Sequence, residues 1–356
     1  MSSIPTLPGI SSRVVATARL GIHTLFSGAE GGTPVLFVHG NASSSTFWEE
    51  QMLLLPAGYQ GIAPDLRGYG DTEDLPVDAT RGYGDWVDDL LGLLDALGVD
   101  RFHVVGHSLG GGVLYSLLVA AAARVRSATL VCPASPFGFG GTRGLDGTPC
   151  APDFAGSGGG VVNPDFARRI AEGDRSAEAQ TSPRAVMNSA YWKPPFVPAR
   201  EEELLSSVLS ERIGPERYPG DTATSPNWPF VAPGVWGPAN AISPKYVGDT
   251  VERLVGAAHK PPLLWVRGAD DIIVADNSLF DIGTLGQMGL IPGWPGAEVF
   301  PPQPMVGQTR AVLERYAAAG GSFREVVIPN TGHSPFIERP SEFAALLGEF
   351  LSANQQ

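Results

Sequence analysis

Residues 102–112 read Phe-His-Val-Val-Gly-His-Ser-Leu-Gly-Gly-Gly, and this stretch decides the fold. A four-residue apolar run of strand type is followed, after a short turn, by an apolar segment of helical length that reaches about Ala123. Gly106, Ser108 and Gly110 match G-x-S-x-G, the pattern of a sharp strand-to-helix turn that exposes a serine. Only small residues fit two positions before and two positions after the serine, because the strained turn crowds its neighbours. The stretch therefore predicts a nucleophile at Ser108, beside the free N–H groups of a helix N-terminus.

Apolar runs elsewhere in the chain predict further buried strands of a parallel sheet. We expect these strands over Val35–Val38, Gly61–Asp65, Ala128–Val131, Leu263–Val266 and Glu325–Ile328. A helix is predicted from Asp85 to Gly98, and an amphipathic helix closes the chain. Two short segments, Arg13–Ala18 and Leu20–Phe26, fit a hairpin. Because strands alternate with helices, the fold class is α/β.

The alternation of strands and helices stops between Pro133 and about Lys260. This region is rich in Gly and Pro, and only residues 200–213 and 245–258 are predicted to be helical. We therefore expect one core interrupted by one long insertion. The predicted division is a core of residues 1–133 and 261–356 and an inserted segment of residues 134–260.

Two other strand ends supply the partners that a serine nucleophile needs. A serine hydroxyl reacts poorly without a base, and His333 lies in a loop just after the strand Glu325–Ile328. Asp270 and Asp271 follow the strand Leu263–Val266, and either carboxylate could orient the imidazole. The carboxyl ends of parallel strands meet at one edge of a sheet, where functional groups gather. The sequence thus predicts a Ser–Asp–His set in this chain order.

Acyl transfer also needs hydrogen-bond donors for a developing oxyanion. The strand Val35–Val38 leads into the loop His39-Gly40-Asn41-Ala42-Ser43. We expect the backbone N–H of Asn41 or Ala42 to face the site, opposite the N–H of Leu109. Two further histidines, His103 and His107, flank the serine turn and are expected to pack against it.

Composition excludes several classes of function. The 356 residues carry a net charge of −13, so the chain lacks the positive excess expected of a protein that binds nucleic acid or an anionic membrane. The uncharged stretch between Arg101 and Arg124 is nominally long enough to span a bilayer. Its histidines and glycines fit a strand, a turn and a buried helix better.

Cysteine content and motifs narrow the expectations further. Cys132 and Cys150 cannot form a disulfide framework and are expected to be free thiols. No signal peptide is visible at the N-terminus, which favours a cytoplasmic location. Neither H-E-x-x-H, C-x-x-C nor a Walker loop occurs, so we expect no metal and no cofactor. The partner should be a small-molecule substrate, and the sequence leaves open whether the chain forms a homo-oligomer.

Together these motifs resemble those of the α/β-hydrolase family. The matching segments keep the family order and cover both ends of the core: Phe37–Asn41, Ala63–Gly70, Gly106–Gly111, Gly268–Val274 and Gly332–Pro340. The resemblance implies a mostly parallel sheet flanked by helices, with residues 134–260 as a long cap. It also implies Asp271 as the acid, because the family's acid lies three residues after the strand-end glycine, here Gly268. Asp270 should then turn toward solvent or a cap contact.

One position departs from the most similar branch of that family. The loop Phe37–Asn41, followed by Phe47 and Trp48, is similar to that of haloalkane dehalogenases and epoxide hydrolases, which use an aspartate where this chain has Ser108. An alkyl-enzyme ester requires that carboxylate. A serine implies an acyl-enzyme instead, and hence cleavage of an ester, thioester, lactone or amide.

We therefore expect a serine hydrolase that cleaves carboxylic esters of hydrophobic or aromatic small molecules. Ser108, Asp271 and His333 are the expected triad, and the N–H groups of Asn41 and Leu109 the expected oxyanion hole. The alternatives are C–C bond, lactone or amide hydrolysis by the same triad, a hydroxynitrile lyase, or a ligand receptor that kept the fold.

The loop-rich regions supply the apolar side chains that would bind such a substrate. We expect them to form cap core and, in smaller part, an apolar pocket beside the triad. A second loop-rich stretch, residues 277–304, should add a wall over the site. The side chains are Phe137, Phe139, Tyr191, Trp192, Phe196, Trp228, Phe230 and Trp236, with Phe280, Met288, Ile291 and Trp294.

Overall fold

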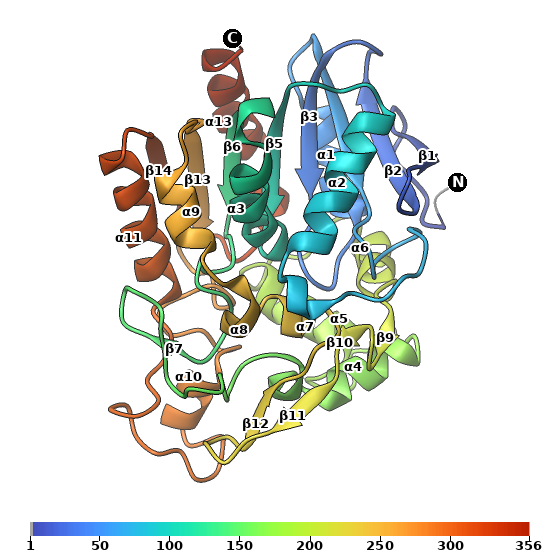
Figure 1. Ribbon diagram of the computed structural model, residues 1–356. Coiled ribbons are helices and arrows are strands. Elements are labelled where there is room, and N and C mark those ends of the chain that lie inside the picture. Colours follow the sequence, from blue (N-terminus) through green and yellow to red (C-terminus); the bar gives the residue numbers. More distant parts are fainter. Residues whose placement is uncertain (1–2, 356) are drawn as a thin grey trace.

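The computed structural model describes residues 3–355 and is built around an eight-stranded sheet (Figure 1). The strand order is β1-β2-β4-β3-β5-β6-β13-β14. The strands are β1 (Ser11–Ala16), β2 (Gly21–Gly28), β3 (Thr33–Val38), β4 (Tyr59–Pro64), β5 (Phe102–His107), β6 (Val125–Val131), β13 (Leu263–Gly268) and β14 (Phe323–Ile328). All the strands predicted from apolar runs are therefore present.

Strand directions confirm the predicted α/β class. Strands β4, β3, β5, β6, β13 and β14 pair in parallel along the sheet. Strands β1 and β2 form the predicted antiparallel hairpin, and β2 joins the sheet antiparallel to β4. The carboxyl ends of the six parallel strands consequently meet along one edge, which is where the chemical side chains were expected.

Helices cover both faces of the sheet (Figure 1). The face toward the viewer carries α2 (Gly84–Ala96), α3 (Leu109–Ala121), α9 (Thr250–Gly256) and α11 (Met305–Ala318). The opposite face carries α1 (Glu49–Leu53), α12 (Pro335–Glu338) and α13 (Pro340–Ala353).

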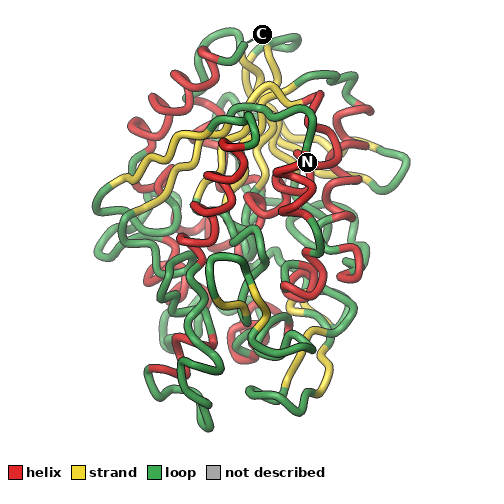
Figure 2. The backbone as a smooth tube through the Cα atoms, turned by 60° about the vertical axis from the view of Figure 1, so that its left-hand side comes forward, coloured by secondary structure: helices red, strands yellow, loops and turns green. Residues whose placement is uncertain are grey.

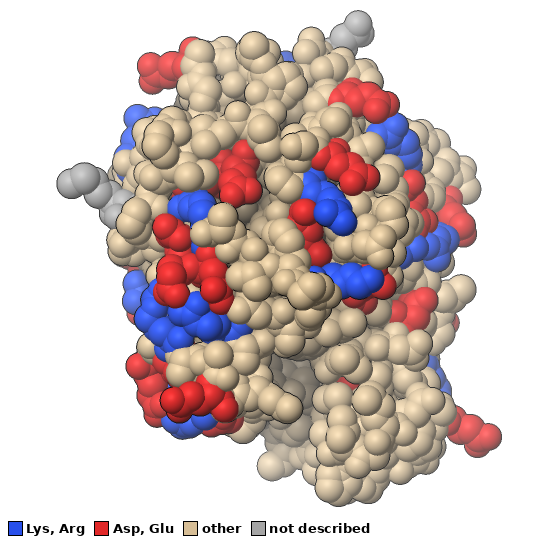
Figure 3. Space-filling model, turned by 180° about the vertical axis from the view of Figure 1, so that it is seen from behind, with Lys and Arg blue, Asp and Glu red and all other residues tan. Residues whose placement is uncertain are grey.

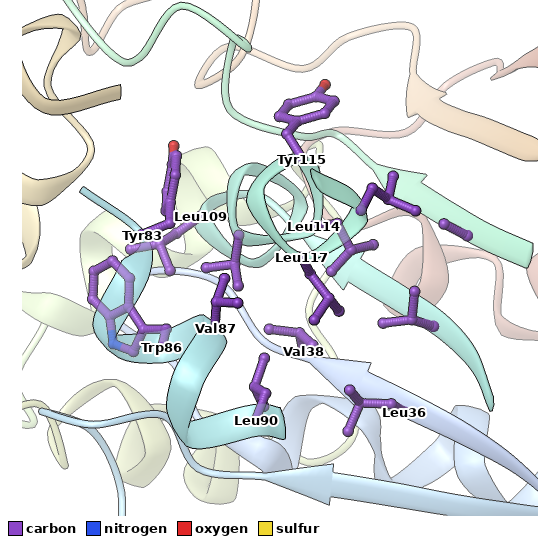
Figure 4. Close-up of a cluster of buried hydrophobic side chains, with 14 of the residues drawn as sticks. Leu36, Val38, Tyr83, Trp86, Val87, Leu90, Leu109, Leu114, Tyr115 and Leu117 are labelled. Carbon is purple, nitrogen blue, oxygen red and sulfur yellow. The ribbon is translucent and has the colours of Figure 1, made fainter. Parts of the chain in front are cut away.

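Alternation along the strands divides the hydrophobic core into two layers. Leu36 and Val38 of β3 pack with α2 and α3, whereas Val35 and Phe37 face the layer of α1 and α13. Figure 4 shows the first layer, where side chains of β3, α2 and α3 point toward one another. Each large apolar side chain buried this way contributes roughly 1.5–3 kcal/mol relative to exposure. Leu109 belongs to this layer, so its side chain anchors the first turn of α3 in the core.

The chain between β6 and β13 consists mostly of loops and short elements beyond the carboxyl edge of the sheet (Figure 2). The helices there are α4 (Pro164–Ala171), α5 (Pro183–Val186), α6 (Glu201–Val208), α7 (Pro238–Ala241) and α8 (Pro244–Val247). The short strands are β7 (Thr142–Arg143), β8 (Thr148–Pro149), β9 (Ile213–Gly214), β10 (Tyr218–Pro219), β11 (Thr222–Thr224) and β12 (Val231–Pro233). The many Gly and Pro residues of this region favour loops, because both residue types are disfavoured inside helices and strands.

Two helices predicted in this region differ from those observed. The helix expected over residues 200–213 is α6, which ends at Val208. The helix expected over residues 245–258 is divided into α8 and α9 by Gly248, whose φ of 61° lies in the left-handed region. Helix α9 then packs on the sheet face beside α3, and the proposed boundary at residue 260 stays a prediction.

The second loop-rich stretch contains α10 (Ile282–Gln287) and packs against the inserted segment. The amide of Gln303 accepts from the Gly140 N–H at 2.7 Å and donates to the Gly138 carbonyl at 3.0 Å. The rings of Trp228 and Phe300 meet edge to face, with centroids 4.8 Å apart. The two loop regions therefore support each other, and the predicted wall over the site stays a prediction. Within residues 3–355, no helix is both long and apolar enough to cross a membrane.

Candidate active site

Ser108 occupies a strained turn between β5 and α3. Its φ and ψ are 54° and −117°, a conformation that side chains rarely adopt. A Cβ atom added at Gly106 would lie 2.6 Å from the carbonyl oxygen of Gly110, and one at Gly110 would lie 2.4 Å from that of Val38. These approaches explain why the turn requires glycine on both sides. The Ser108 N–H donates to the Val131 carbonyl at 3.0 Å, which fixes the turn to β6.

His333 and Asp271 form a buried pair at the ends of two neighbouring strands. The His333 Nδ1 atom lies 2.8 Å from Asp271 Oδ2, and the residues are 3% and 9% exposed. The other carboxylate oxygen of Asp271 accepts from the N–H groups of Ile273 and Val274, at 2.8 and 3.0 Å. A carboxylate only accepts hydrogen bonds, so we assign the proton to Nδ1. The Nε2 atom is then available as a base.

The neighbouring carboxylate, Asp270, points elsewhere. Its side chain is exposed and pairs with Lys193 Nζ at 3.0 Å, and Lys193 also reaches Asn330 at 3.3 Å. Lys193 belongs to the inserted segment, so the contact joins that segment to the loop before His333. The structure thus brings Asp271, and not Asp270, to the imidazole.

His107 joins the loop of His333 to the serine turn. His107 Nε2 donates to the backbone carbonyl of His333 at 2.9 Å, and the two rings lie 4.7 Å apart. Burial lowers the pKa of His107 well below its usual value, and the neighbouring His333 lowers it further. A neutral His107 therefore packs beside Ser108 and ties the base to the nucleophile's strand. On the other side, Glu338 accepts from the Gly332 N–H at 2.6 Å.

The loop after β3 offers an unpaired backbone donor. The Gly40 carbonyl accepts from His39 Nδ1 at 2.8 Å and from Ser43 Oγ at 2.9 Å, which fixes the Gly40–Asn41 peptide. The N–H groups of Asn41 and Leu109 donate to no other group among the described residues. A Cβ atom at Gly40 would lie 3.0 Å from Ser108 Cβ, so this loop borders the serine. Two backbone donors therefore flank Ser108, the arrangement that an oxyanion requires.

Sequence reasoning missed Cys132 as a neighbour of this site. The thiol is buried, and its sulfur lies within 4.8 Å of the donor atoms of Asp271 and His333. Burial raises the pKa of Cys132 well above its usual value, and the Asp271 carboxylate adds to the rise. Cys132 directly follows β6, so its position at the carboxyl end of a parallel strand could have predicted that it lies at the same sheet edge.

In the described part of the chain, two groups of side chains have donor atoms close enough for a metal ion. They are Cys132, Asp271 and His333, and His23, Asp65 and Asp71. In each group the histidine and one aspartate already hydrogen-bond to each other, at 2.8 and 2.7 Å. A metal would have to displace that bond. The arrangement suits proton positioning better than coordination.

The expected apolar side chains divide into several environments. Tyr191 and Trp192 are buried, and the Tyr191 hydroxyl donates to the Ala42 carbonyl of the β3 loop at 3.1 Å. The expectation that all of them form cap core or pocket is wrong for Phe230, Phe280 and Met288, which are 64%, 41% and 57% exposed. Phe230 lies at a φ of 69° in the loop between β11 and β12, and Phe280 and Met288 lie in the second loop-rich stretch, where loops leave part of the apolar surface uncovered. An apolar pocket beside the triad stays a prediction.

Comparison with known proteins agrees with this fold. The model of the Alpha/beta hydrolase family matches residues 35–346. The chain is 34% identical over 149 residues to a 2-hydroxymuconate semialdehyde hydrolase of Pseudomonas sp. (strain CF600). It is 40% identical over 102 residues to epoxide hydrolase 2 of Siraitia grosvenorii. These matches cover 41% and 28% of this chain, and 51% and 32% of the two relatives. The chain thus spans about half or less of the curated relatives it matches.

Solved structures share the fold over nearly the whole chain. A serine hydrolase, CCSP0084, from the polyaromatic hydrocarbon-degrading bacterium Cycloclasticus zankles has a TM-score of 0.61 at 18% identity, over 97% of this chain and 98% of that one. The esterase RhEst1 from Rhodococcus sp. ECU1013 has a TM-score of 0.58 at 23% identity, over 97% and 99%. At these identities the likeness establishes the architecture.

Proposed function

We propose that this chain, which belongs to the alpha/beta hydrolase family, is a serine hydrolase that cleaves carboxylic esters of hydrophobic or aromatic small molecules. One observation carries the proposal. The strained turn at Ser108 lies between two unpaired backbone N–H groups and beside the His333–Asp271 pair. Nucleophile, base, orienting acid and oxyanion donors are the parts that acyl transfer needs.

In the first half of the reaction, His333 Nε2 takes the hydroxyl proton of Ser108 while Ser108 Oγ attacks the ester carbonyl. The carbonyl oxygen becomes an oxyanion held by the N–H groups of Asn41 and Leu109. The imidazolium gives its proton to the leaving alcohol as the C–O bond breaks. This step leaves an acyl group on Ser108, and Asp271 stabilises the transient positive charge on the ring.

The second half repeats these steps with water as the nucleophile. His333 removes a proton from water, the hydroxide attacks the acyl carbonyl, and the same two N–H groups hold the oxyanion. The proton then returns to Ser108 Oγ as the acid product leaves. No other redox or group-transfer partner is required.

The side chain at position 108 favours this chemistry over epoxide opening. Some relatives are epoxide hydrolases, and the resemblance implies an aspartate nucleophile in that branch. Serine cannot form the corresponding alkyl-enzyme ester. The esterase and serine hydrolase among the structural neighbours support an acyl-enzyme route, and the apolar side chains of the inserted segment support an apolar substrate.

Hydrolysis of a C–C bond by the same triad is the second candidate. It is favoured by the relative from Pseudomonas, whose name describes a semialdehyde hydrolase. The two candidates differ in the carbonyl compound that is attacked, so a substrate panel separates them.

The test is turnover of a panel of nitrophenyl esters with short, long and aromatic acyl groups, alongside 2-hydroxymuconate semialdehyde, the compound in the name of the Pseudomonas relative. Ester turnover that disappears in Ser108→Ala supports the proposal. Turnover of the semialdehyde alone would move the function to C–C hydrolysis. Ligand binding without turnover of any substrate would indicate a non-catalytic receptor.

A further inference from the structure

Glu338 is a buried carboxyl group whose two oxygens connect separate parts of the chain. It is the last residue of α12 and is 6% exposed. Its Oε1 atom accepts from the Gly332 N–H at 2.6 Å, and its Oε2 atom accepts from the backbone N–H of Lys193 at 2.9 Å. Gly332 directly precedes His333, whereas Lys193 belongs to the inserted segment. A single side chain therefore bridges the inserted segment and the loop of the candidate base.

This bridge requires a carboxylate. An ionised carboxylate only accepts hydrogen bonds, and bonds to a charged acceptor are stronger than those between neutral groups. Burial raises the pKa of Glu338, and the two N–H groups oppose that rise. A glutamine amide has one acceptor atom, so it could accept from only one of the two N–H groups, and its own N–H would face the other.

The short helix α12 is itself fixed to the core, which gives Glu338 a defined place. The ring of Phe336 stacks on Trp48 with centroids 4.2 Å apart and meets His107 edge to face at 5.0 Å. The Gln51 side chain donates to the Phe336 carbonyl at 2.8 Å. The helix is thus held by both a side chain and a backbone group, and its carboxylate is held with it.

The inserted segment lies directly against the loop of His333. A Cβ atom added at Gly332 would lie 2.9 Å from the backbone nitrogen of Lys193 and 2.9 Å from the carbonyl carbon of Trp192. A larger residue would push the two segments apart, and this close approach is why glycine fits there. Lys193 Nζ makes a second contact with the same loop, at 3.3 Å from Asn330 Oδ1.

The backbone is held by side chains on both sides of His333. Glu338 binds the N–H of the preceding residue, and His107 Nε2 donates to the His333 carbonyl at 2.9 Å. The ring is then oriented by Asp271, 2.8 Å from Nδ1. These contacts together set where Nε2 lies relative to the nucleophile. A displacement of about 1 Å in such a group can cost about 100-fold in rate.

We propose that Glu338 is a positioning residue for His333, which it supports through the Gly332 N–H. The inserted segment shares in this support, because the same carboxylate binds the Lys193 N–H. The inference deepens the proposed function and rests on it for the role of His333 as a base. It gives the inserted segment a part in orienting the base, besides any contact with the substrate.

The experiment compares Glu338→Gln with wild type in hydrolysis of a nitrophenyl ester. The amide keeps only one of the two bonds, so the loop of His333 should shift. We expect kcat to fall about 10- to 100-fold while KM changes less than about twofold, because the bonds orient the base and do not hold the substrate. Glu338→Asp is the second variant, since its carboxylate is one methylene too short to span both N–H groups. Its kcat should also fall, and it decides the matter if the glutamine variant does not fold.

Glu49→Gln is the matched control. Glu49 is also a buried carboxyl whose pKa is raised by burial, and it also contacts the inserted segment. Its Oε2 atom accepts from the Leu7 N–H at 2.6 Å and lies 3.1 Å from the guanidinium of Arg200. These bonds hold the N-terminal segment instead of the loop of the base. Thermal unfolding should show a loss of stability in both glutamine variants, but kcat of Glu49→Gln should stay within about twofold of wild type.

Proton NMR reports the orientation of the base directly. The Nδ1 proton that His333 shares with Asp271 should give a far-downfield signal, and Asp271→Asn, which removes that signal, assigns it. The signal should broaden or shift in Glu338→Gln and match wild type in Glu49→Gln. If Glu338 served stability alone, the signal would stay unchanged in every folded variant.

The outcomes separate the two proposals. Wild type without Ser108-dependent turnover would overturn the proposed function, and the NMR comparison would then still decide whether Glu338 orients His333. Wild-type kcat in folded Glu338→Gln, or an unchanged signal, would overturn the inference alone. An equal loss of kcat in Glu49→Gln would also overturn it, because the effect would then follow from the loss of any buried carboxylate that contacts the inserted segment.

Discussion

Within residues 3–355, two serines each lie near a hydrogen-bonded histidine–aspartate pair. Outside the candidate site, Ser12 Oγ lies 2.9 Å from His23 Nε2, and His23 Nδ1 lies 2.7 Å from Asp65 Oδ2. In the candidate site the His333–Asp271 distance is 2.8 Å, and no hydrogen bond joins Ser108 to His333 among the described residues. Judged by hydrogen bonds alone, the first arrangement is the more complete. Catalytic hydrogen bonds are often loose before substrate binds, so this measure cannot decide between them.

The backbone around each serine separates the two arrangements. Ser12 lies within β1, where it pairs with Leu25 of β2 in a regular antiparallel ladder. Ser108 lies on a turn at positive φ, at the N-terminus of α3 and beside the unpaired N–H of Asn41. Under the proposed function, the strained backbone and the neighbouring N–H donors distinguish Ser108 from Ser12. A serine near a histidine–aspartate pair is not sufficient.

The two aspartates also have different tasks. Asp65 accepts from His23, from both the N–H and the hydroxyl of Ser45, and from the Asp71 N–H, so both its oxygens are fully used. It ties β2 and β4 to the loops beside them. One carboxylate oxygen of Asp271 accepts from the N–H groups of the turn that follows it, and the other accepts from His333. The hydrogen bonds of Asp65 join parts of the fold, whereas those of Asp271 leave it placed to orient His333 as the proposed mechanism requires.

Ser108→Ala should produce the largest effect of any change in either arrangement. We expect kcat to fall about 10⁴- to 10⁶-fold, because triad members act as a unit. The fold should survive, since only a hydroxyl is lost and the turn is held by glycines and a backbone bond. Steady-state kinetics with a nitrophenyl ester, together with labelling by a fluorophosphonate, measure the loss. Retention of labelling would mean that another serine reacts.

Asp271→Asn should have the next largest effect. The amide cannot stabilise the imidazolium and favours the wrong tautomer, so kcat should fall about 10³- to 10⁴-fold. Asp270→Asn is the control, because that side chain is exposed and pairs with Lys193. It should leave most activity. A larger loss in Asp270→Asn would place the acid at Asp270 and contradict the pairing in the structure.

Asp65→Asn should affect stability and leave the chemistry intact. Removing one partner of a buried pair costs about 3 kcal/mol of unfolding free energy. Burial alone would raise the pKa of Asp65, but the hydrogen bond and charge of His23, together with His39 and the Ser45 hydroxyl, lower that pKa overall. The stabilisation is therefore present above the unfolded pKa of about 3.9 and is lost as the pH falls through the folded value.

Denaturant unfolding at several pH values checks this prediction. The difference between wild type and Asp65→Asn should be constant near neutral pH and shrink in acid. The activity per folded molecule should match wild type. A large loss of kcat in a folded variant would give the second arrangement a catalytic role.

The sheet could be predicted because a strand that is buried on both faces is apolar at every position of the sequence. The runs Val35–Val38 and Leu263–Val266 are apolar without interruption, and both are central parallel strands. Helix ends inside the insertion were harder to predict. The pattern over residues 245–258 continues through Gly248, although the chain reverses there at positive φ. Local spacing does not report a turn that tertiary packing imposes.

The candidate site could be predicted only where a residue follows a recognisable strand. Ser108, Asp271 and His333 all do, and they meet at one edge because parallel strands end together. Cys132 also follows a strand, but a buried cysteine usually serves packing, so its type gave no signal of a place beside the candidate site. The loop-rich regions were also harder to predict, because some of the apolar side chains expected inside them, such as Phe230 and Met288, are exposed. Figure 3 shows a mostly uncharged lobe at the lower right, on the side of α10. The exposed apolar side chains of residues 277–304 are Leu279, Phe280, Met288, Leu290 and Val299.

Ser12→Ala should be the smallest change and the sharpest test of the comparison. The substitution removes the contact of His23 Nε2 with Ser12, so the protein should lose about 1 kcal/mol of unfolding free energy. Turnover and fluorophosphonate labelling should be those of wild type, because Ser12 lies in a regular antiparallel strand and not on a strained turn at a helix N-terminus. The same two assays applied to Ser108→Ala should show the opposite pattern, with stability retained and reactivity lost. Reduced labelling in Ser12→Ala at full stability would mean that hydrogen-bonded geometry alone can activate a serine in a strand.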